Sequence, residues 1–157
     1  MGKSNVETYH QKNLLDNTKK LRNLLSEMPG FCKDYFRGIE NTTSIRTRVG
    51  YAYDLRTFFR FLISENPTIG NDIKDITLKH LDELKPVDIE EYMDYLKLYY
   101  IDDKKFTNDE RGLHRKLSSL RKFYMYYQKR EILKNNPTTV VEMPKIHSKE
   151  IVRLDDD

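Results

Sequence analysis

The residues most suited to chemistry form a row of cations in the C-terminal third of the sequence. At about 100° per residue, one narrow helical face holds Arg111, Arg115, Ser118, Lys122 and Lys129. Lysine and arginine neutralise phosphate charge and a serine hydroxyl donates hydrogen bonds, so this face is suited to a nucleic-acid backbone. An ordinary solvated helix face is the alternative, and the scarcity of acidic residues on this face favours nucleic acid.

Motifs for catalysis or metal binding are not found in the sequence. None of the four histidines stands in a His-Glu-x-x-His motif, and the single cysteine, Cys32, has no second thiol for a metal site or a disulfide. There is no glycine-rich phosphate loop and no Gly-x-Ser-x-Gly elbow. The acidic residues 155–157 could attract a divalent ion, but such a run is usually a solvated tail. We therefore expect no cofactor and no metal.

The distribution of charge also indicates a binding role. Residues 107–134 contain eight bases and three acids, giving +5, and residues 44–65 give +2, whereas residues 86–103 give −5 within an overall charge of +3. The protein should therefore have a basic side and an acidic side. No apolar run approaches the ~20 residues of a membrane span, and the N-terminus lacks the core of a signal sequence. With a single cysteine, these features predict a cytoplasmic protein without membrane contact.

Long helices are expected to position these residues, because six glycines and five prolines in 157 residues are few interruptions. Apolar residues at three- and four-residue spacing predict helices over residues 6–27, 31–39 and 44–64. Ser44 provides a polar start for the third of these helices, and its apolar stripe should be buried. The segment 75–84 is predicted to be a short helix or a strand-like turn.

Two further helices are predicted from capping patterns in the second half of the sequence. Residues 88–91 indicate a helix start, and the apolar stripe of that helix extends to Tyr100. Residues 107–110 form a second capping pattern, which opens a helix that should end near Lys134. The apolar stripe of this last helix consists of Leu113, Leu117, Leu120, Tyr124 and Tyr127.

Four stretches of the sequence share their order and spacing with a known family. They are residues 47–62, 73–89, 115–124 and 136–145. They resemble the second helix, the approach to the third helix, the fourth helix and the following linker of the core-binding domain in tyrosine recombinases, the family of phage and transposon integrases. The resemblance implies an all-α fold, a SAM-like four-helix core-binding bundle with an extra N-terminal helix.

The resemblance also implies domain boundaries and a function. Residues 1–30 would form a helical extension, residues 31–135 the core-binding domain, and residues 136–157 a linker toward a catalytic domain. In the family, the core-binding domain forms half of a clamp around double-stranded DNA, and the catalytic domain of the same polypeptide forms the other half. The second and fourth helices of the family's bundle face the DNA. Here the corresponding segments are basic, so we expect them to share one surface.

The candidate DNA contacts follow from the basic face and from the resemblance. They are Thr47, Arg48, Arg111, Arg115, Lys116, Ser118, Lys122 and Lys129. Thr47 and Arg48 lie in the first turns of a predicted helix, where the helix N-terminus favours phosphate, although simple capping by Thr47 is the alternative. Arg121 lies toward the flank of the basic face, where a structural ion pair is the competing interpretation.

The sequence predicts a chain that binds DNA and does not cut it. The family's catalytic domain contains a His-x-x-Arg pair and an attacking tyrosine, whereas no His-x-x-Arg occurs here and residues 151–157 resemble only the start of that domain. We therefore expect a non-catalytic piece of a recombinase used in DNA integration, with other recombinase protomers as partners on DNA. The alternative is a helical protein–protein module that docks an acidic partner. A small helix-turn-helix regulator is disfavoured, because no such motif with a glycine turn precedes the basic helix.

Overall fold

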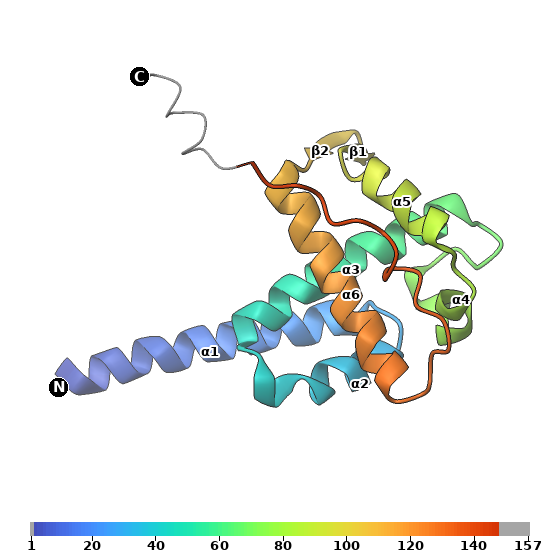
Figure 1. Ribbon diagram of the computed structural model, residues 1–157. Helices are drawn as coiled ribbons and strands as arrows, with labels where there is room; N and C mark the ends of the chain where they lie inside the picture. The colour runs from blue at the N-terminus through green and yellow to red at the C-terminus, as the bar shows by residue number, and fades with distance from the viewer. Residues whose placement is uncertain (1, 148–157) are drawn as a thin grey trace, which may run out of the picture. The chain divides into compact units, whose positions relative to one another are not determined.

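The computed structural model describes residues 2–147. Their contacts form two compact units, which divide the chain between Leu81 and Asp82 and are described separately. The described residues form six α-helices and one two-stranded sheet, so the prediction of a mainly α-helical fold is confirmed (Figure 1). The domain boundaries expected from the sequence stay a prediction. The expected start of a catalytic domain, at residues 151–157, lies outside the described residues.

The first unit is built on two long helices and one short helix, α1, α3 and α2, that match those predicted from apolar spacing. In chain order its elements are α1 (Gly2–Ser26), α2 (Phe31–Gly38), the 3₁₀ turn η1 (Glu40–Thr42), α3 (Ile45–Glu65), the 3₁₀ turn η2 (Ile73–Asp75) and α4 (Leu78–Asp82). The helix α1 packs along α3 (Figure 1). The segment predicted as a short helix or turn therefore contains both a 3₁₀ turn and one short helix.

The core of the first unit is apolar and rich in aromatic rings. The stripe predicted for α3 is buried at Val49, Ala52, Leu55, Phe59 and Leu62. The rings of Phe31 in α2 and Phe59 in α3 meet edge to face, with their centroids 5.8 Å apart. Cys32 is fully buried in the same core, and this burial raises the pKa of its thiol. The packing of α2 against α3 therefore anchors the C-terminal part of α3, the helix whose first turn carries two of the predicted site residues.

The second unit contains a β-hairpin that the sequence analysis missed. Its elements are α5 (Pro86–Tyr95), β1 (Leu98–Ile101), β2 (Lys104–Thr107) and α6 (Glu110–Lys129). The strands pair antiparallel, and Asp102 and Asp103 form the turn with φ angles of 51° and 66°. Two-residue hairpin turns favour such angles, and aspartate tolerates them. The helix predicted to extend to Tyr100 is therefore wrong beyond Tyr95.

Both capping predictions placed the helix start on the wrong residue. Asp88 lies in the first turn of α5 instead of preceding the helix, and its carboxylate accepts a hydrogen bond from the N–H of Lys85 at 2.7 Å. The helix α6 is capped by Asp109 and not by Thr107, because the Asp109 carboxylate accepts the N–H of Gly112 at 2.9 Å. Aspartate is as good a cap as threonine, so composition alone did not decide between them.

The helix α6 ends at Lys129, earlier than the predicted end near Lys134. Glu131 adopts a left-handed backbone with a φ of 59°, which is typical of the residue after a helix. The Asp82 carboxylate then accepts hydrogen bonds from the N–H groups of Lys134 and Asn135, at 3.0 and 2.8 Å. These bonds hold the following residues as a loop instead of a further helical turn.

Residues 138–147 run back along α6 toward its first turn. The Arg121 guanidinium in the middle of α6 donates to the carbonyl oxygens of Thr138, at 3.2 Å, and Val141. Near the start of α6, His147 contacts the Glu110 carboxylate. These bonds give Arg121 a structural role. Among the described helices, none combines the length and the hydropathy of a membrane span.

Candidate nucleic-acid interface

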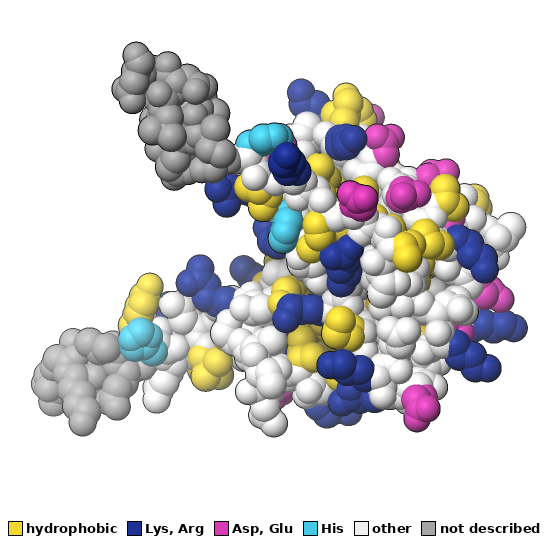
Figure 2. Space-filling view, in the orientation of Figure 1, with side chains coloured by type: hydrophobic (Ala, Val, Ile, Leu, Met, Phe, Trp, Pro, Cys, Tyr) yellow, Lys and Arg dark blue, Asp and Glu magenta, His cyan; other side chains and the backbone are white. Residues whose placement is uncertain are grey.

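The helix α6 divides cleanly into an apolar face and a polar face. The predicted apolar stripe, from Leu113 to Tyr127, is buried, with every member at most 8% exposed. The opposite face, which we name the α6 ridge, consists of Arg111, Arg115, Ser118, Lys122, Met125 and Lys129. Its four cations are exposed and Ser118 is half-buried. Figure 2 shows lysine and arginine side chains along the surface formed by α6.

Met125 is the member of the α6 ridge that the sequence analysis did not include. Its side chain is 47% exposed, and it lies three residues after Lys122 and four before Lys129. An exposed methionine adds apolar contact area between two cations. Its three- and four-residue spacing from Lys122 and Lys129 was the available signal.

Lys116 does not join the α6 ridge. It is only 8% exposed, and its Nζ donates a hydrogen bond to Asn108 Oδ1 at 2.9 Å. The amide nitrogen of Asn108 in turn donates to the carbonyl oxygen of Leu96, also at 2.9 Å. Lys116 therefore ties α6, through Asn108, to the residue that follows α5. This arrangement makes Lys116 a structural cation and not a surface contact.

Gly112 provides the space that this hydrogen-bonded chain needs. A Cβ atom at Gly112 would lie 2.8 Å from Asn108 Oδ1, closer than side-chain packing allows. Any larger residue would therefore push away the amide that holds Lys116. Gly112, the capping residue Asp109 and the buried Lys116 therefore together hold the first turns of α6, from which the α6 ridge begins.

The start of α3 carries the other two predicted site residues, and these lie in different surroundings. Thr47 is exposed, and its backbone N–H donates to Ser44 Oγ at 3.1 Å while its own hydroxyl accepts from Ser44 Oγ at 3.0 Å. Arg48 is only 9% exposed, and its side chain lines a pocket between α1 and α2. The shared surface expected for the two basic helices stays a prediction, because α3 and α6 belong to separate units.

Glu110 lies next to Arg111, the first cation of the α6 ridge, and is hydrogen-bonded to His147. The N–H of His147 donates to Glu110 Oε1 at 3.2 Å, and His147 Nδ1 lies 2.7 Å from Glu110 Oε2. The hydrogen bond from the backbone of His147 is the main cause that lowers the pKa of the Glu110 carboxyl, followed by the bond from its ring. Glu110 is thereby engaged with His147 next to Arg111.

The structure bears on metal binding and on one tyrosine, Tyr124. Within residues 2–147 no group of three or more histidine, cysteine, aspartate or glutamate side chains is placed to hold a metal ion. Tyr124 is fully buried, and burial, aided by the negative charges of Asp82 and Asp88, raises the pKa of its phenol. A protonated, enclosed phenol is a packing group.

Comparison with curated proteins decides the family. The protein named tyrosine recombinase XerC from Caldanaerobacter subterraneus is 35% identical to this chain over 118 residues, which cover 72% of the chain. The tyrosine recombinase XerC of Leptospira interrogans is also 35% identical, over 108 residues that cover 69% of the chain. The chain belongs to the tyrosine recombinase family. It spans 32% and 29% of the length of these two relatives.

Membership rests on these sequence relatives and on the mainly helical fold. No protein-family model matches the chain. No solved structure matches it either. The family resemblance stated from the motifs at residues 47–62 and 115–124 is confirmed at the level of the family, while the DNA contacts of individual residues stay a prediction.

Proposed function

We propose that this chain is the DNA-binding, core-binding part of a tyrosine-type site-specific recombinase and that the α6 ridge contacts duplex DNA. The observation that carries the proposal is the division of α6 into a buried apolar stripe and an exposed row of four cations around one serine. Membership of the tyrosine recombinase family supports the same conclusion.

The geometry of the α6 ridge fits a phosphate backbone. Arg111 and Lys129 are eighteen residues apart in the sequence, which corresponds to about 27 Å of helix. Duplex DNA carries one negative charge per ~1.7 Å of axis, so such a ridge can meet several phosphates at once. The width of the major groove admits an α-helix, so Arg115 in the first half of the ridge also comes within reach of base edges.

The other predicted contacts contribute unequally in this proposal. Thr47 is exposed at the N-terminus of α3, where backbone N–H groups and the helix dipole favour a phosphate. Arg48 and Lys116 are buried, so we assign neither a direct phosphate contact, and Lys116 acts indirectly by holding the start of α6 through Asn108. In this proposal Ser118 supplies a hydroxyl to a phosphate oxygen between two cations.

In the proposed reaction this chain forms half of a clamp on double-stranded DNA in the cytoplasm. The catalytic domain of the same polypeptide forms the other half and carries the tyrosine that attacks the phosphate. Other recombinase protomers bind the same DNA during integration or recombination. The residues described here hold and orient the duplex and take no part in bond cleavage.

The salt dependence of DNA binding tests the proposal. If the four exposed cations of the α6 ridge each meet a phosphate, the slope of log K against log salt should be about −3.6, a loss of roughly a hundredfold between 50 and 200 mM. Lys122→Ala should reduce the slope by about 0.9. Fluorescence anisotropy of a labelled 30-base-pair duplex provides the measurement.

Lys97→Ala is the matched control for this experiment. Lys97 is an exposed lysine of the same unit, with 64% of its side chain accessible, and it pairs with Asp94 in the acidic segment. Its removal should leave the slope unchanged. Equal slopes for the wild type, Lys122→Ala and Lys97→Ala would exclude the α6 ridge from the interface and leave the acidic-partner alternative.

A further inference from the structure

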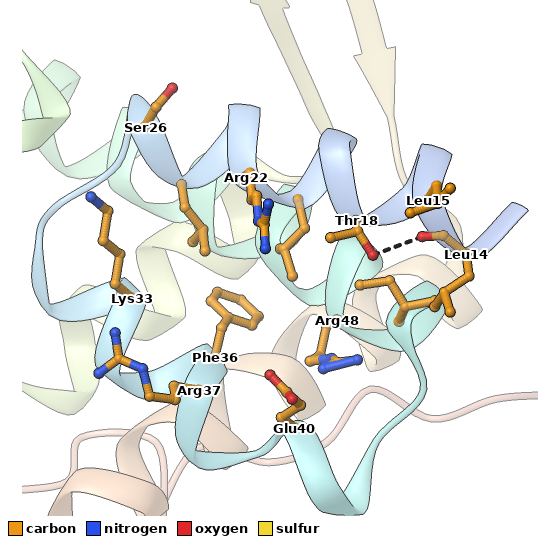
Figure 3. A pocket seen from close by; sticks show the side chains of 13 residues that line it. Leu14, Leu15, Thr18, Arg22, Ser26, Lys33, Phe36, Arg37, Glu40 and Arg48 are labelled. Carbon is orange, nitrogen blue, oxygen red and sulfur yellow. Dashed lines mark hydrogen bonds between the residues drawn. The ribbon is translucent and has the colours of Figure 1, made fainter. Parts of the chain in front are cut away.

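An open pocket of about 660 Å³ lies within the first unit, between α1, α2 and the start of α3 (Figure 3). Its apolar lining includes Leu14, Leu21, Leu25, Phe36 and Ile45. Its basic lining consists of Arg22, Lys33, Arg37 and Arg48. Glu40 is the single acidic residue among the residues that line it. The pocket therefore combines an apolar lining with an excess of positive charge.

Arg48 is the decisive residue in this pocket. It is 9% exposed and its side chain extends into the pocket, as Figure 3 shows. Its Nε atom has no hydrogen-bond partner within the part of the chain that the structure describes. A buried guanidinium with an unused donor is costly unless an anion pairs with it. Arg48 thus brings an unpaired Nε–H donor to the wall of the pocket.

The wall formed by α1 is better suited to a ligand with an apolar part than to a simple anion. Leu14 and Leu15 line the pocket and are 53% and 58% exposed. The Thr18 hydroxyl donates a hydrogen bond to the carbonyl oxygen of Leu14 at 2.7 Å, so this side chain is already hydrogen-bonded within α1. Phosphate or another small ion would leave these leucines in water, whereas an apolar ligand would cover them.

The shape of the pocket indicates a helical ligand. Its lining along α1 extends from Leu14 to Ser26, which corresponds to about 18 Å or three helical turns. A groove of this length with apolar walls is typical of sites that bind an amphipathic helix through residues at three- and four-residue spacing. The basic residues at its edges would complement acidic residues on the polar face of such a helix.

We propose that this pocket binds an acidic amphipathic helix of a partner protein. The leucines of that helix pack between α1 and Phe36, and one glutamate or aspartate carboxylate pairs with Arg48. Arg22, Lys33 and Arg37 receive the flanking acidic side chains. Duplex DNA is the less suitable occupant, because a phosphate backbone would leave the exposed Leu14 and Leu15 uncovered. The inference uses residues of the first unit alone and does not depend on the α6 ridge.

A peptide library provides the test on the complete 157-residue chain. The probe is a phage-displayed set of helical 16-residue peptides with leucines fixed at three- and four-residue spacing and the other positions random. Selection should enrich glutamate or aspartate at one position between the leucines. Arg48→Met should raise the Kd of the enriched peptide at least tenfold, and replacing its selected acid by the amide should have the same effect.

Two further variants keep this test decisive. Arg46→Met removes an exposed cation of the same helix and should leave the Kd within twofold. Leu14→Glu places a charge on the exposed wall of the pocket, where folding is not at risk, and should weaken binding at least tenfold. Circular dichroism should show unchanged helix content for each variant.

Several outcomes would overturn the proposal. Selected peptides without an acidic preference, or with an affinity indifferent to Arg48→Met and Leu14→Glu, would remove the pocket as their site. If a 30-base-pair duplex displaces the peptide from the wild type, and Arg48→Met no longer binds that duplex, the pocket would be assigned to DNA. Sedimentation of the chain as a dimer that Arg48→Met dissociates would assign it to a second copy of this chain.

Discussion

The substitution Lys116→Met separates a structural cation from a DNA contact. Lys116 is buried and its ammonium donates to Asn108 Oδ1, while Asn108 donates to the Leu96 carbonyl. A hydrogen bond to a charged group contributes about 1.5–3 kcal/mol, and methionine restores part of this by avoiding the burial of a charge. We expect a loss of about 1–2 kcal/mol in the free energy of unfolding. We expect no change in the salt slope of DNA binding.

A double-mutant cycle measures the bond itself. Asn108→Ala should cost about 2–3 kcal/mol, because it leaves both the Lys116 ammonium and the Leu96 carbonyl without this partner. The double variant should cost less than the sum of the two, with a coupling energy of about 1–2 kcal/mol. Urea denaturation followed by circular dichroism provides each value, with an unchanged m-value as the condition for comparison.

Gly112→Ala is an independent probe of the same arrangement. Its added Cβ would meet Asn108 Oδ1 at 2.8 Å, so alanine should lower the free energy of unfolding despite its higher helix propensity.

The structural role of Lys116 is refuted if Lys116→Met leaves the free energy of unfolding unchanged and reduces the salt slope of DNA binding by about 0.9. That result would mean that the ammonium meets a phosphate and not Asn108.

Three further predictions concern groups with defined partners. Asp82→Ala should lower the free energy of unfolding by about 1–3 kcal/mol, measured in urea, because two backbone N–H groups lose their acceptor; an effect below ~0.5 kcal/mol would contradict the loop assignment. Cys32 should not react with a thiol reagent in the native state, because burial raises its pKa, and should react fully in denaturant. His147 lowers the pKa of Glu110 in the folded state. The contribution of this pair to the free energy of unfolding is therefore present above the unfolded pKa near 4.5 and is lost as the pH falls through the lower folded pKa. An NMR titration of the His147 amide should show this transition, and it should disappear in Glu110→Gln.

Apolar spacing predicted α3 and α6 well, because each of these helices buries one apolar stripe. The stripe from Leu113 to Tyr127 is buried as expected, and α3 begins after Ser44 as the polar cap indicates. The hairpin was missed for a physical reason. Its strands have four residues each, too short for a clear alternation, and a helical stripe could be continued through Tyr100 by chance. Only the adjacent aspartates at the turn, with their tolerance of positive φ, signalled the reversal.

Helix ends were less predictable than helix faces, because local and distant groups compete for the same backbone donors. Lys134 and Asn135 follow a helix whose composition would support another turn. Their N–H groups instead bind Asp82, which lies more than fifty residues earlier in the sequence. A contact between residues so far apart leaves no periodic trace, so the sequence alone could not show where α6 stops.

Two of the predicted site residues, Arg48 and Lys116, are buried cations, and their spacing in the sequence already indicated this burial. Arg48 precedes Ala52, Leu55 and Phe59 at steps of four, three and four, so it lies in phase with the buried face of α3. Lys116 lies three residues after Leu113 and four before Leu120, in phase with the buried face of α6. A cation in phase with an apolar stripe must bury its charge and therefore needs a polar partner inside the protein or across an interface. Lys116 has such a partner in Asn108, whereas Nε of Arg48 has none among the described residues, and the acidic helix proposed for the pocket would provide a carboxylate beside Arg48.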